Sequence, residues 1–297
     1  MKITNVNHLQ IKQQESPRVV ALGLFEAMHL GHVELIKTAV SSARANGYLA
    51  TVVTVSKPVN KHGNMIFDID HRIAKMQELG VEELIVIEMN DAVRNSDSTT
   101  FMNFLNNLDA KLLVCGADYR FGYLGGGDVE LLKTQFEMVI PSFTLIDNQK
   151  VSTTLIKKSL QCGNIAHANT LLGYNYYIKG IVKKGKQLGR TIGAPTANIY
   201  PNISPVATGV YLTITTIDNN HYRSITNVGY NPTVGDNQLS VETYIGDGFN
   251  QEIYEQEIKV EMIGRIREEI KFNSIDELKA RLKSDIKYME EANYENC

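Results

Sequence analysis

Two histidines with a leucine and a glycine between them stand where an apolar run gives way to a helical pattern. The segment His29-Leu30-Gly31-His32 follows "VVALGLFEAM" and precedes "VELIKTAV". Imidazoles at the start of a helix can donate hydrogen bonds to phosphate oxygens and stabilise charge that develops during group transfer. One alternative is a structural pair of core histidines. Another is a metal site, but no nearby cysteine or carboxylate pattern completes a zinc site.

A second group of polar residues stands at another predicted helix start. In "VSTTLIKK", Ser152 and Thr153 come first and Lys157 follows within the helix. Hydroxyl groups and a cation at a helix N-terminus suit a triphosphate. By themselves, however, the hydroxyl groups would indicate an ordinary helix cap.

A third segment, residues 180–200, combines glycines with cations. Its sequence is "GIVKKGKQLGRTIGAPTANIY", which contains Gly185, Lys186, Gly189 and Arg190. Glycines allow the backbone to wrap around an anion, and the cations offset the charge of that anion. The segment lacks the Gly-Lys-Ser/Thr ending of a Walker loop, and the ordinary alternative is a charged hairpin tip.

Strands and helices in alternation must position the first two groups. Apolar and β-branched runs predict strands over residues 18–25, 48–55, 83–89 and 110–118 and a further strand within 136–146. Helical patterns follow Gly31, occupy residues 68–80 with Gly80 as C-cap, and occupy residues 98–108 with Ser98 as N-cap. This alternation predicts a doubly wound parallel sheet. Ligands of such sheets bind beyond the carboxyl ends of the strands, where residues 23–32 fall.

Beyond residue 166, short β-rich segments are separated by glycine, asparagine and aspartate. They predict an antiparallel barrel or sandwich, of which we expect the barrel, followed by one amphipathic helix with a capping box at Ser274 and Glu277. We therefore expect an α/β domain with a parallel sheet over residues 1–166 and an antiparallel β-barrel domain over residues 167–297, ending in a long helix.

The composition limits the kinds of partner. The chain has 297 residues and a formal net charge of −3, so no overall basic field would attract nucleic acid. No apolar run reaches the length of a membrane span, and the first residues lack a signal-peptide core. The three cysteines are too far apart for a disulfide framework or a zinc site. We expect a cytoplasmic protein without a membrane or nucleic-acid partner, and the sequence leaves open whether it is a homo-oligomer.

The three polar groups also carry a family resemblance. The first two resemble the His-x-Gly-His motif and the Ser/Thr-rich helix start of the nucleotidylyltransferase superfamily, whose domain is Rossmann-like. The third resembles riboflavin kinases through Pro195-Thr196-Ala197-Asn198, and "GVYLTI", "NVGYNPTV" and "VETYIGD" follow in that family's order. Together the two modules cover nearly the whole chain. The sequence is therefore identified as a member of the prokaryotic bifunctional riboflavin kinase/FMN adenylyltransferase family, often called FAD synthetases.

The resemblance implies roles for residues of the adenylyltransferase module. His29 and His32 would be catalytic. The nucleotide-binding residues would be Gly23, Phe25, Gly31, Asp118, Ser152, Thr153 and Lys157.

The resemblance also implies roles for residues of the kinase module. Glu242 would be the catalytic carboxylate, and Arg267 would bind the flavin. Thr196 and Asn198 would hold Mg²⁺ together with ATP, since Mg²⁺ accepts hydroxyl and amide oxygens beside phosphates and water. The other nucleotide-binding residues would be Gly185, Lys186, Gly189 and Arg190.

The sequence departs from the family mainly in the first module. The turn before the histidines reads Gly23-Leu24-Phe25-Glu26-Ala27, where the family usually has Gly-Asn-Phe-Asp-Gly. A usual Thr-Phe-x-Pro-His-Pro loop is replaced over residues 54–59, and the usual Lys and Arg of a later loop are replaced by Tyr123 and Leu124 with the glycines after them. Lys157 stands in place of an arginine, which removes bidentate phosphate recognition. In the kinase signature, Ala194 replaces a common aromatic residue.

These residues imply two successive reactions, with ATP and Mg²⁺ in each and flavins as substrates and products. Riboflavin would be phosphorylated to FMN, and FMN would be adenylylated to FAD. Because the departures gather in the first module, one alternative is a single-activity riboflavin kinase whose N-terminal module only binds or regulates. Another is a non-catalytic regulator that binds flavin or nucleic acid, and the charge of the chain argues against nucleic acid.

Overall fold

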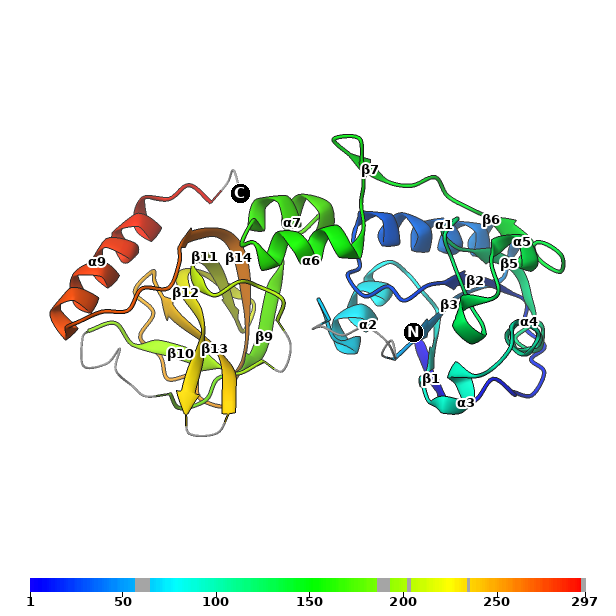
Figure 1. Ribbon diagram of the computed structural model, residues 1–297, viewed down its shortest axis with the longest axis horizontal. Coiled ribbons are helices and arrows are strands. Elements are labelled where there is room, and N and C mark those ends of the chain that lie inside the picture. Colours follow the sequence, from blue (N-terminus) through cyan, green and yellow to red (C-terminus); the bar gives the residue numbers. More distant parts are fainter. Residues whose placement is uncertain (57–64, 186–192, 202–203, 234–235, 295–297) are drawn as a thin grey trace. The chain divides into compact units, whose positions relative to one another are not determined.

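Parallel and antiparallel strands segregate into two compact units, Met1–Thr153 and Thr154–Cys297. This computed structural model describes residues 1–56, 65–185, 193–201, 204–233 and 236–294. Figure 1 shows the parallel-sheet unit from the N-terminus and the antiparallel unit that ends with α9. The sequence placed the division after residue 166, whereas helix α6 (Thr153–Gln161) lies almost wholly in the second of these units.

The first unit is built on a six-stranded parallel sheet, as the alternating pattern predicts. The strand order is β1-β4-β3-β2-β5-β6, and every neighbouring pair is parallel. The strands are β1 (Lys2–Val6), β2 (Arg18–Leu22), β3 (Leu49–Val55), β4 (Glu83–Ile87), β5 (Ala110–Val114) and β6 (Glu137–Val139). β1 was not predicted. It adds an edge strand whose side chains are mostly exposed, so it lacks the apolar pattern of a central strand.

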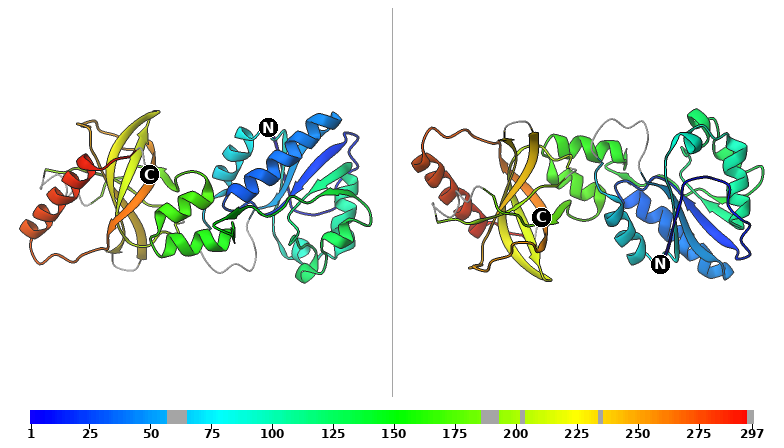
Figure 2. Two further views of the ribbon diagram at one scale, coloured as in Figure 1. Left: turned by 90° about the horizontal axis from the view of Figure 1, so that it is seen from above. Right: turned by 90° about the horizontal axis from the view of Figure 1, so that it is seen from below.

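Helices cover both faces of this sheet, as Figure 2 shows. α1 and α2 bury their apolar residues against one face, and α4 and α5 bury theirs against the other. The helices are α1 (Leu30–Asn46), α2 (Ile69–Glu78), α3 (Asp91–Arg94), α4 (Ser98–Asn107) and α5 (Val129–Leu132), with a short 3₁₀ turn at Tyr123–Gly125. The doubly wound arrangement is therefore confirmed.

The chain reverses direction across the sheet between β2 and β5. From β2 it proceeds to β3 and β4 on one side, and later it continues through β5 and β6 on the other. Loops that leave the carboxyl ends of such a strand pair diverge, which opens a crevice there. The turn that contains His29 and the segment after β5 both lie at this crevice.

Several predicted strand and helix ends need correction. The strands predicted over residues 83–89 and 110–118 end at Ile87 and Val114, and the C-cap of α2 is Leu79 and not Gly80. The first strand was predicted to reach Phe25 but ends at Leu22. The N-cap of α4 is Asp97 and not Ser98, because Asp97 Oδ1 accepts a hydrogen bond of 2.7 Å from the Thr100 backbone N–H. The carboxylate reaches the free N–H groups of the first turn, and Ser98 becomes the first helical residue.

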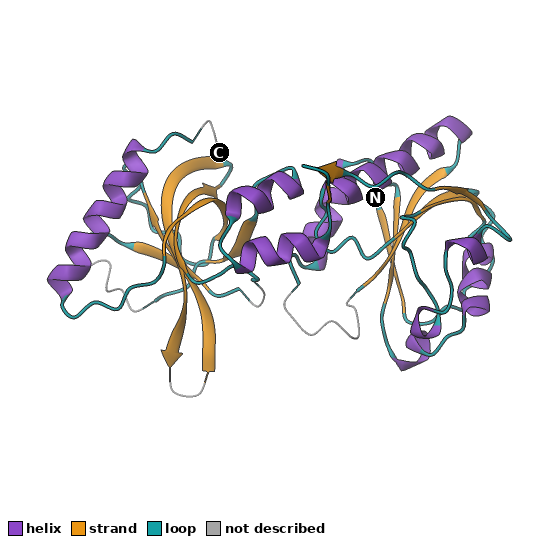
Figure 3. Ribbon diagram, turned by 45° about the horizontal axis from the view of Figure 1, so that its top comes forward, coloured by secondary structure: helices purple, strands orange, loops and turns teal. Residues whose placement is uncertain are grey.

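The second unit is a six-stranded antiparallel sheet that curves into a barrel (Figure 3). The strand order is β10-β13-β12-β11-β14-β9, and a bridge between Lys183 and Asn198 links the chain just after β9 to β10. The strands are β9 (Tyr177–Ile181), β10 (Thr196–Ile199), β11 (Gly209–Ile217), β12 (Asn220–Thr233), β13 (Asp236–Ile245) and β14 (Glu257–Arg267). The predicted antiparallel barrel is confirmed.

Three helices and one short hairpin complete the part of the chain that the structure describes. The hairpin of the first unit pairs β7 (Leu145–Ile146) with β8 (Gln149–Lys150), and α7 (Ile165–Leu172) follows α6. The final helix, α9 (Ile275–Glu291), packs Met289 against Leu212 and Ile225 of the sheet. Its predicted cap is present, since Ser274 Oγ accepts from the Glu277 backbone N–H at 3.1 Å.

The opposite face of the barrel sheet carries a layer of buried hydroxyl groups. Thr213 lies 2.8 Å from Ser224 and 2.9 Å from Thr226, measured between side-chain oxygens, and Thr226 lies 3.0 Å from Thr243. All four residues are fully buried, so each hydroxyl group depends on its neighbours for hydrogen bonds. These contacts link β11, β12 and β13 side by side.

No helix in the described part of the chain combines the length and apolarity needed to cross a lipid bilayer.

Candidate active sites

The turn between β2 and α1 is tightly constrained. Phe25 and Met28 have φ angles of 52° and 46°, in the left-handed region that side chains other than glycine rarely adopt. A Cβ atom at Gly23 would lie 2.8 Å from the Phe25 ring, so only glycine fits there. Strained backbone of this kind persists where the surrounding structure fixes it, and it often marks a functional site.

His29 and His32 form a stacked pair at the start of α1. Their ring centroids are 3.6 Å apart with an interplanar angle of 14°. His29 is the N-cap of the helix, and its Nδ1 accepts a hydrogen bond of 3.2 Å from the His32 backbone N–H. Because Nδ1 accepts, the neutral His29 ring carries its proton on Nε2.

Burial sets the charge of His29. Loss of solvent lowers the pKa of His29 to about 4, and the nearby Lys150 ammonium acts in the same direction. The side chain is therefore a neutral N–H donor at neutral pH, and not an imidazolium. It can polarise a phosphate oxygen without adding a full charge.

The crevice of the first unit holds a cavity of about 630 Å³. Of the nine residues predicted for this module, eight line the cavity, namely Gly23, Phe25, His29, Gly31, His32, Asp118, Ser152 and Thr153. They come from the turn after β2, the segment after β5 and the start of α6. Lys157 is not among the lining residues and lies one helical turn beyond Thr153, in the second unit.

Two cations line the same cavity, and the sequence analysis identified neither. Lys150 Nζ lies 2.7 Å from Asp118 Oδ2, and Arg120 Nη1 lies 3.1 Å from Asp128 Oδ2. The hydrogen bond from Lys150 holds the pKa of Asp118 below its ordinary value. A basic residue just before the Ser152 helix start was the available signal for Lys150.

A buried arginine ties the ends of β2 and β3 together behind the cavity. Arg72 is fully buried and donates to the Leu24 carbonyl at 3.0 Å, the Val55 carbonyl at 3.0 Å and the Ser56 carbonyl at 2.8 Å. Glu26, also buried, accepts from the Ile66 backbone N–H at 3.2 Å. Leu24 and Glu26, two of the departures from the family pattern, are thus built into a well-connected turn. Residues 57–59 of the replaced loop lie outside the described residues.

The second site lies where β10 and β13 pair. Asn198 is directly opposite Glu242, and Glu242 is directly opposite Asn227 on β12. Directly paired residues on neighbouring strands share a face of the sheet, so the three polar side chains form a row. Thr196, opposite Tyr244, lies on the same face two residues away.

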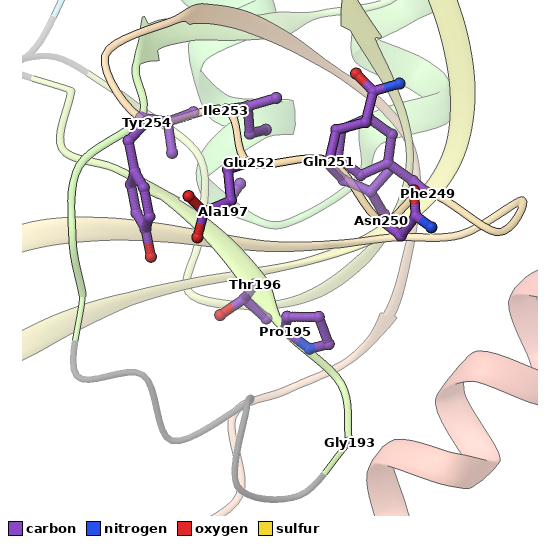
Figure 4. A pocket seen from close by; sticks show the side chains of 12 residues that line it. Gly193, Pro195, Thr196, Ala197, Phe249, Asn250, Gln251, Glu252, Ile253 and Tyr254 are labelled. Atoms are coloured by element: carbon purple, nitrogen blue, oxygen red, sulfur yellow. The ribbon is translucent and has the colours of Figure 1, made fainter.

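Thr196 lines two cavities of the barrel unit. The first, of about 340 Å³, lies between Thr196 and the segment Phe249–Tyr254, as Figure 4 shows. The second, of about 210 Å³, contains Glu242 and Arg267 together with apolar side chains that include Ile270, Phe272 and Leu278. Two ligands placed in these cavities would approach one another at Thr196.

Arg267 is held in the wall of the smaller cavity by the final helix. Its Nη2 donates to Asp285 Oδ2 at 2.7 Å and its Nε donates to the same oxygen at 3.1 Å. Its Nη1 donates to the Glu268 carbonyl at 3.0 Å. Asp285 is buried, so this ion pair fixes the plane of the guanidinium group.

Of the remaining residues predicted for the kinase module, the structure describes Asn198 and Gly185. Asn198 lines neither cavity, is buried, and donates to the Thr196 carbonyl at 3.2 Å. A Cβ atom at Gly185 would lie 2.6 Å from the Asn198 side chain, which explains the glycine there. Lys186, Gly189 and Arg190 lie outside the described residues.

The described residues contain no group of three histidine, cysteine, aspartate or glutamate side chains that could hold a metal ion. Thr196 and Asn198 offer neutral oxygen donors, which suit Mg²⁺ only when phosphates and water supply its other ligands. A metal at these two residues would therefore arrive with the nucleotide.

Comparison with known proteins matches each unit to a family. Residues 11–159 match the FAD synthetase family, and residues 172–293 match the riboflavin kinase family. A bifunctional riboflavin kinase/FMN adenylyltransferase of Bacillus subtilis is 35% identical over 301 residues, which cover 95% of this chain and 94% of the relative. One from Listeria monocytogenes is 34% identical over 283 residues and 90% of each chain. The chain belongs to the bifunctional riboflavin kinase/FMN adenylyltransferase family.

A solved structure shares the complete architecture of this riboflavin kinase/FMN adenylyltransferase family member. It is a crystal structure described as a macrolide-efflux protein from Streptococcus pneumoniae, with a TM-score of 0.89 and 30% sequence identity. The match covers 99% of this chain and 100% of that one. Both units therefore occur together in a known structure.

The family matches coincide with the cavities. Every residue that lines the 630 Å³ cavity lies in the part that matches FAD synthetases. Every residue that lines the two barrel cavities lies in the part that matches riboflavin kinases. Each half of this bifunctional family member thus has at least one cavity of its own.

Proposed function

We propose that this chain phosphorylates riboflavin to FMN in its second unit and adenylylates FMN to FAD in its first. The observation that carries the proposal is that each unit holds a separate cavity system lined by the polar side chains its reaction needs. Glu242 and Thr196 line the cavities of the barrel, and the two stacked histidines line the cavity of the parallel sheet.

In the barrel, riboflavin would occupy the smaller cavity, because apolar side chains there suit its ring and Glu242 can reach its ribityl hydroxyl group. ATP would occupy the larger cavity, with its phosphates at Thr196. The hydroxyl oxygen attacks the γ-phosphorus, its proton passes to the Glu242 carboxylate, and ADP leaves as the bond to the bridging oxygen breaks. Mg²⁺ bound at Thr196 and Asn198 with ATP would offset the phosphate charge.

In the parallel-sheet unit, a phosphate oxygen of FMN attacks the α-phosphorus of ATP. The bond between that phosphorus and the bridging oxygen breaks, and pyrophosphate leaves. No proton must be removed from the FMN phosphate, so the site needs donors that stabilise the developing charge more than a base. The neutral His29 N–H, the His32 side chain and the hydroxyl groups of Ser152 and Thr153 would serve as such donors.

The single-activity alternative is less well supported. It rested on the departures that gather in the first module. One of them, the altered turn before the histidines, is closed by Arg72 and Glu26 and keeps both histidines in the cavity wall. The relatives that match across both units are named for both activities.

The test uses two variants with opposite expectations. Purified protein is incubated with ATP, Mg²⁺ and either riboflavin or FMN, and the flavins are separated by chromatography. Glu242→Gln should lower FMN formation by roughly 10²–10⁴-fold and leave FAD formation from FMN unchanged. His32→Ala should stop FAD formation and leave riboflavin phosphorylation unchanged.

Each variant serves as the control for the other, because each retains one reaction. Wild-type protein that makes FMN but no FAD with any common divalent metal would reinstate the kinase-only alternative. Kinase turnover of the wild-type rate in Glu242→Gln would remove Glu242 from the mechanism.

A further inference from the structure

Four consecutive residues, which we call the strap, line the first-unit cavity. Pro141, Ser142, Phe143 and Thr144 all line the cavity and connect β6 to β7. The strap is held at its end, because the Thr144 carbonyl accepts from the Val151 backbone N–H at 3.0 Å. Thr144 also lies close to the histidine turn, since a Cβ atom on Gly31 would be 3.6 Å from its hydroxyl oxygen. The strap is therefore fixed beside the start of α1.

Besides the two histidines, three aromatic side chains line this cavity, and they differ in exposure to solvent. Phe25 is fully buried, and its ring packs against Gly23 and the edge of His32. Tyr119 packs near Phe121, with ring centroids 6.1 Å apart. Phe143 is 45% exposed. Among the described lining residues, it is the phenyl ring available to a ligand.

The ammonium group of Lys150 lies over the Phe143 ring in this structure. Lys150 Nζ lies 3.6 Å from the ring centroid while it also pairs with Asp118. The ring face therefore points toward the Lys150–Asp118 pair in the cavity wall and not only toward solvent. A lysine side chain is long and flexible, so a planar ligand can replace its contact with the ring.

We propose that Phe143 is the residue on which the flavin ring of FMN stacks when FMN is adenylylated. This inference rests on the proposed function of the first unit. The ribityl chain separates the flavin ring from the reacting phosphate, so the ring needs an accessible apolar partner in the cavity wall, and Phe143 is exposed enough to be that partner. The dimethylbenzene end of the flavin has no hydrogen-bonding groups and suits a phenyl ring.

The experiment measures FAD formation from FMN and ATP in the full-length protein. Phe143→Ala should raise the KM for FMN about tenfold, since loss of an aromatic stacking partner typically weakens binding by roughly 5–100-fold. The KM for ATP and the rate of riboflavin phosphorylation should not change. Phe143→Tyr, which keeps the ring, should restore the wild-type KM for FMN.

The matched control is Leu145→Ala. Leu145 is an exposed apolar residue two positions further along the same segment, at 57% exposure, but it does not line the cavity. It should leave every constant unchanged. Phe143→Leu keeps an apolar side chain of similar size, so a raised KM for FMN in this variant would separate the loss of the ring from damage to the strap.

An unchanged KM for FMN in Phe143→Ala would overturn the proposal. A raised KM for ATP with an unchanged KM for FMN would overturn it too, because adenine would then be the ring on Phe143. Direct binding of FMN, followed by quenching of flavin fluorescence, tests the stacking even if the wild-type protein makes no FAD. A wild-type protein that makes no FAD would count against the proposed function. Weaker FMN binding by Phe143→Ala than by Phe143→Tyr would still support the stacking in that case.

Discussion

At the residue scale, three features of its surroundings determine the protonation of the His29 ring. The His32 backbone N–H occupies Nδ1, the His32 ring stacks on one face, and burial removes water. A positive charge on His29 would face the Lys150 ammonium and lose solvation, so the neutral form prevails. The site can therefore operate across the neutral range without a titrating imidazole at this position.

We predict that the His29 ring titrates with a midpoint near 4, well below the ordinary histidine value. The Cε1–H proton resonance followed by NMR as a function of pH gives this midpoint, and His29→Gln assigns the signal. In the unfolded protein the pKa of this histidine is near 6.5, so the unfolded state binds the proton at a higher pH than the folded state does. The free energy of unfolding should therefore fall as the pH drops from about 6.5 to about 4. A midpoint at or above 6.5 would contradict the conclusion that burial lowers the pKa of His29.

Sequence patterns predicted most of the residues that line the first cavity but not its charge arrangement. Residue type and spacing pointed to His29, His32, Ser152 and Thr153, because these residues form short motifs next to helix starts. Lys150 and Phe143 also line the cavity but were not predicted, because their positions depend on a strap and hairpin whose path no local pattern specifies. The left-handed backbone of Phe25 and Met28 was likewise invisible, since it is imposed by packing.

At the element scale, the final helix is bound to the end of β14 by a buried ion pair. Asp285 on α9 accepts from Arg267 and lies 3.3 Å from Arg281 Nε. Leu278 and Leu282 of the same helix line the cavity that contains Glu242. The helix is thus both a wall of the proposed flavin site and the support of Arg267.

Asp285→Ala should destabilise the second unit by about 3–5 kcal/mol, because it leaves the Arg267 guanidinium largely buried without its carboxylate. We expect a lower midpoint in thermal unfolding and a raised KM for riboflavin, with FAD formation from FMN retained. Lys287→Ala is the control, since it breaks an exposed pair with Glu291 on the same helix, worth at most about 1 kcal/mol. Equal effects of the two substitutions would contradict a special role for Asp285.

The elements themselves were largely predictable. The central strands are continuous β-branched runs, and α9 has both an amphipathic pattern and its Ser274 cap, so their types followed from composition. β1 escaped because an exposed edge strand has no apolar signature. The cap of α4 was misplaced by one residue because Asp97 and Ser98 are both good N-caps, and only the fold decides between them.

At the scale of the whole molecule, the proposed sites draw their described lining residues from different units. Among the described residues, those that line the 630 Å³ cavity belong to the first unit, and those that line the barrel cavities belong to the second. We therefore expect FMN made in the barrel to leave as a free product and to be adenylylated by another molecule.

A mixture of Glu242→Gln and His32→Ala proteins should accordingly make FAD from riboflavin and ATP, although neither variant does so alone. Chromatography of the flavins over time should show FMN first and FAD after a lag. The lag should shorten as the concentration of Glu242→Gln protein rises, because that variant consumes the free FMN. A mixture that makes no FAD because its FMN stays bound to the His32→Ala protein, while Glu242→Gln still converts added FMN, would show that the product is not released between the two reactions.

The hydroxyl layer inside the barrel has a consequence for folding specificity. Apolar side chains alone can slide past one another with little preference, whereas Thr213, Ser224, Thr226 and Thr243 find partners only when β11, β12 and β13 are aligned as observed. A slip of one residue turns these side chains to the other face and strands each buried hydroxyl group, at about 1–3 kcal/mol apiece. The layer therefore fixes the register of these three strands, and it keeps Glu242 of β13 opposite Asn227 of β12 by making a shifted pairing costly.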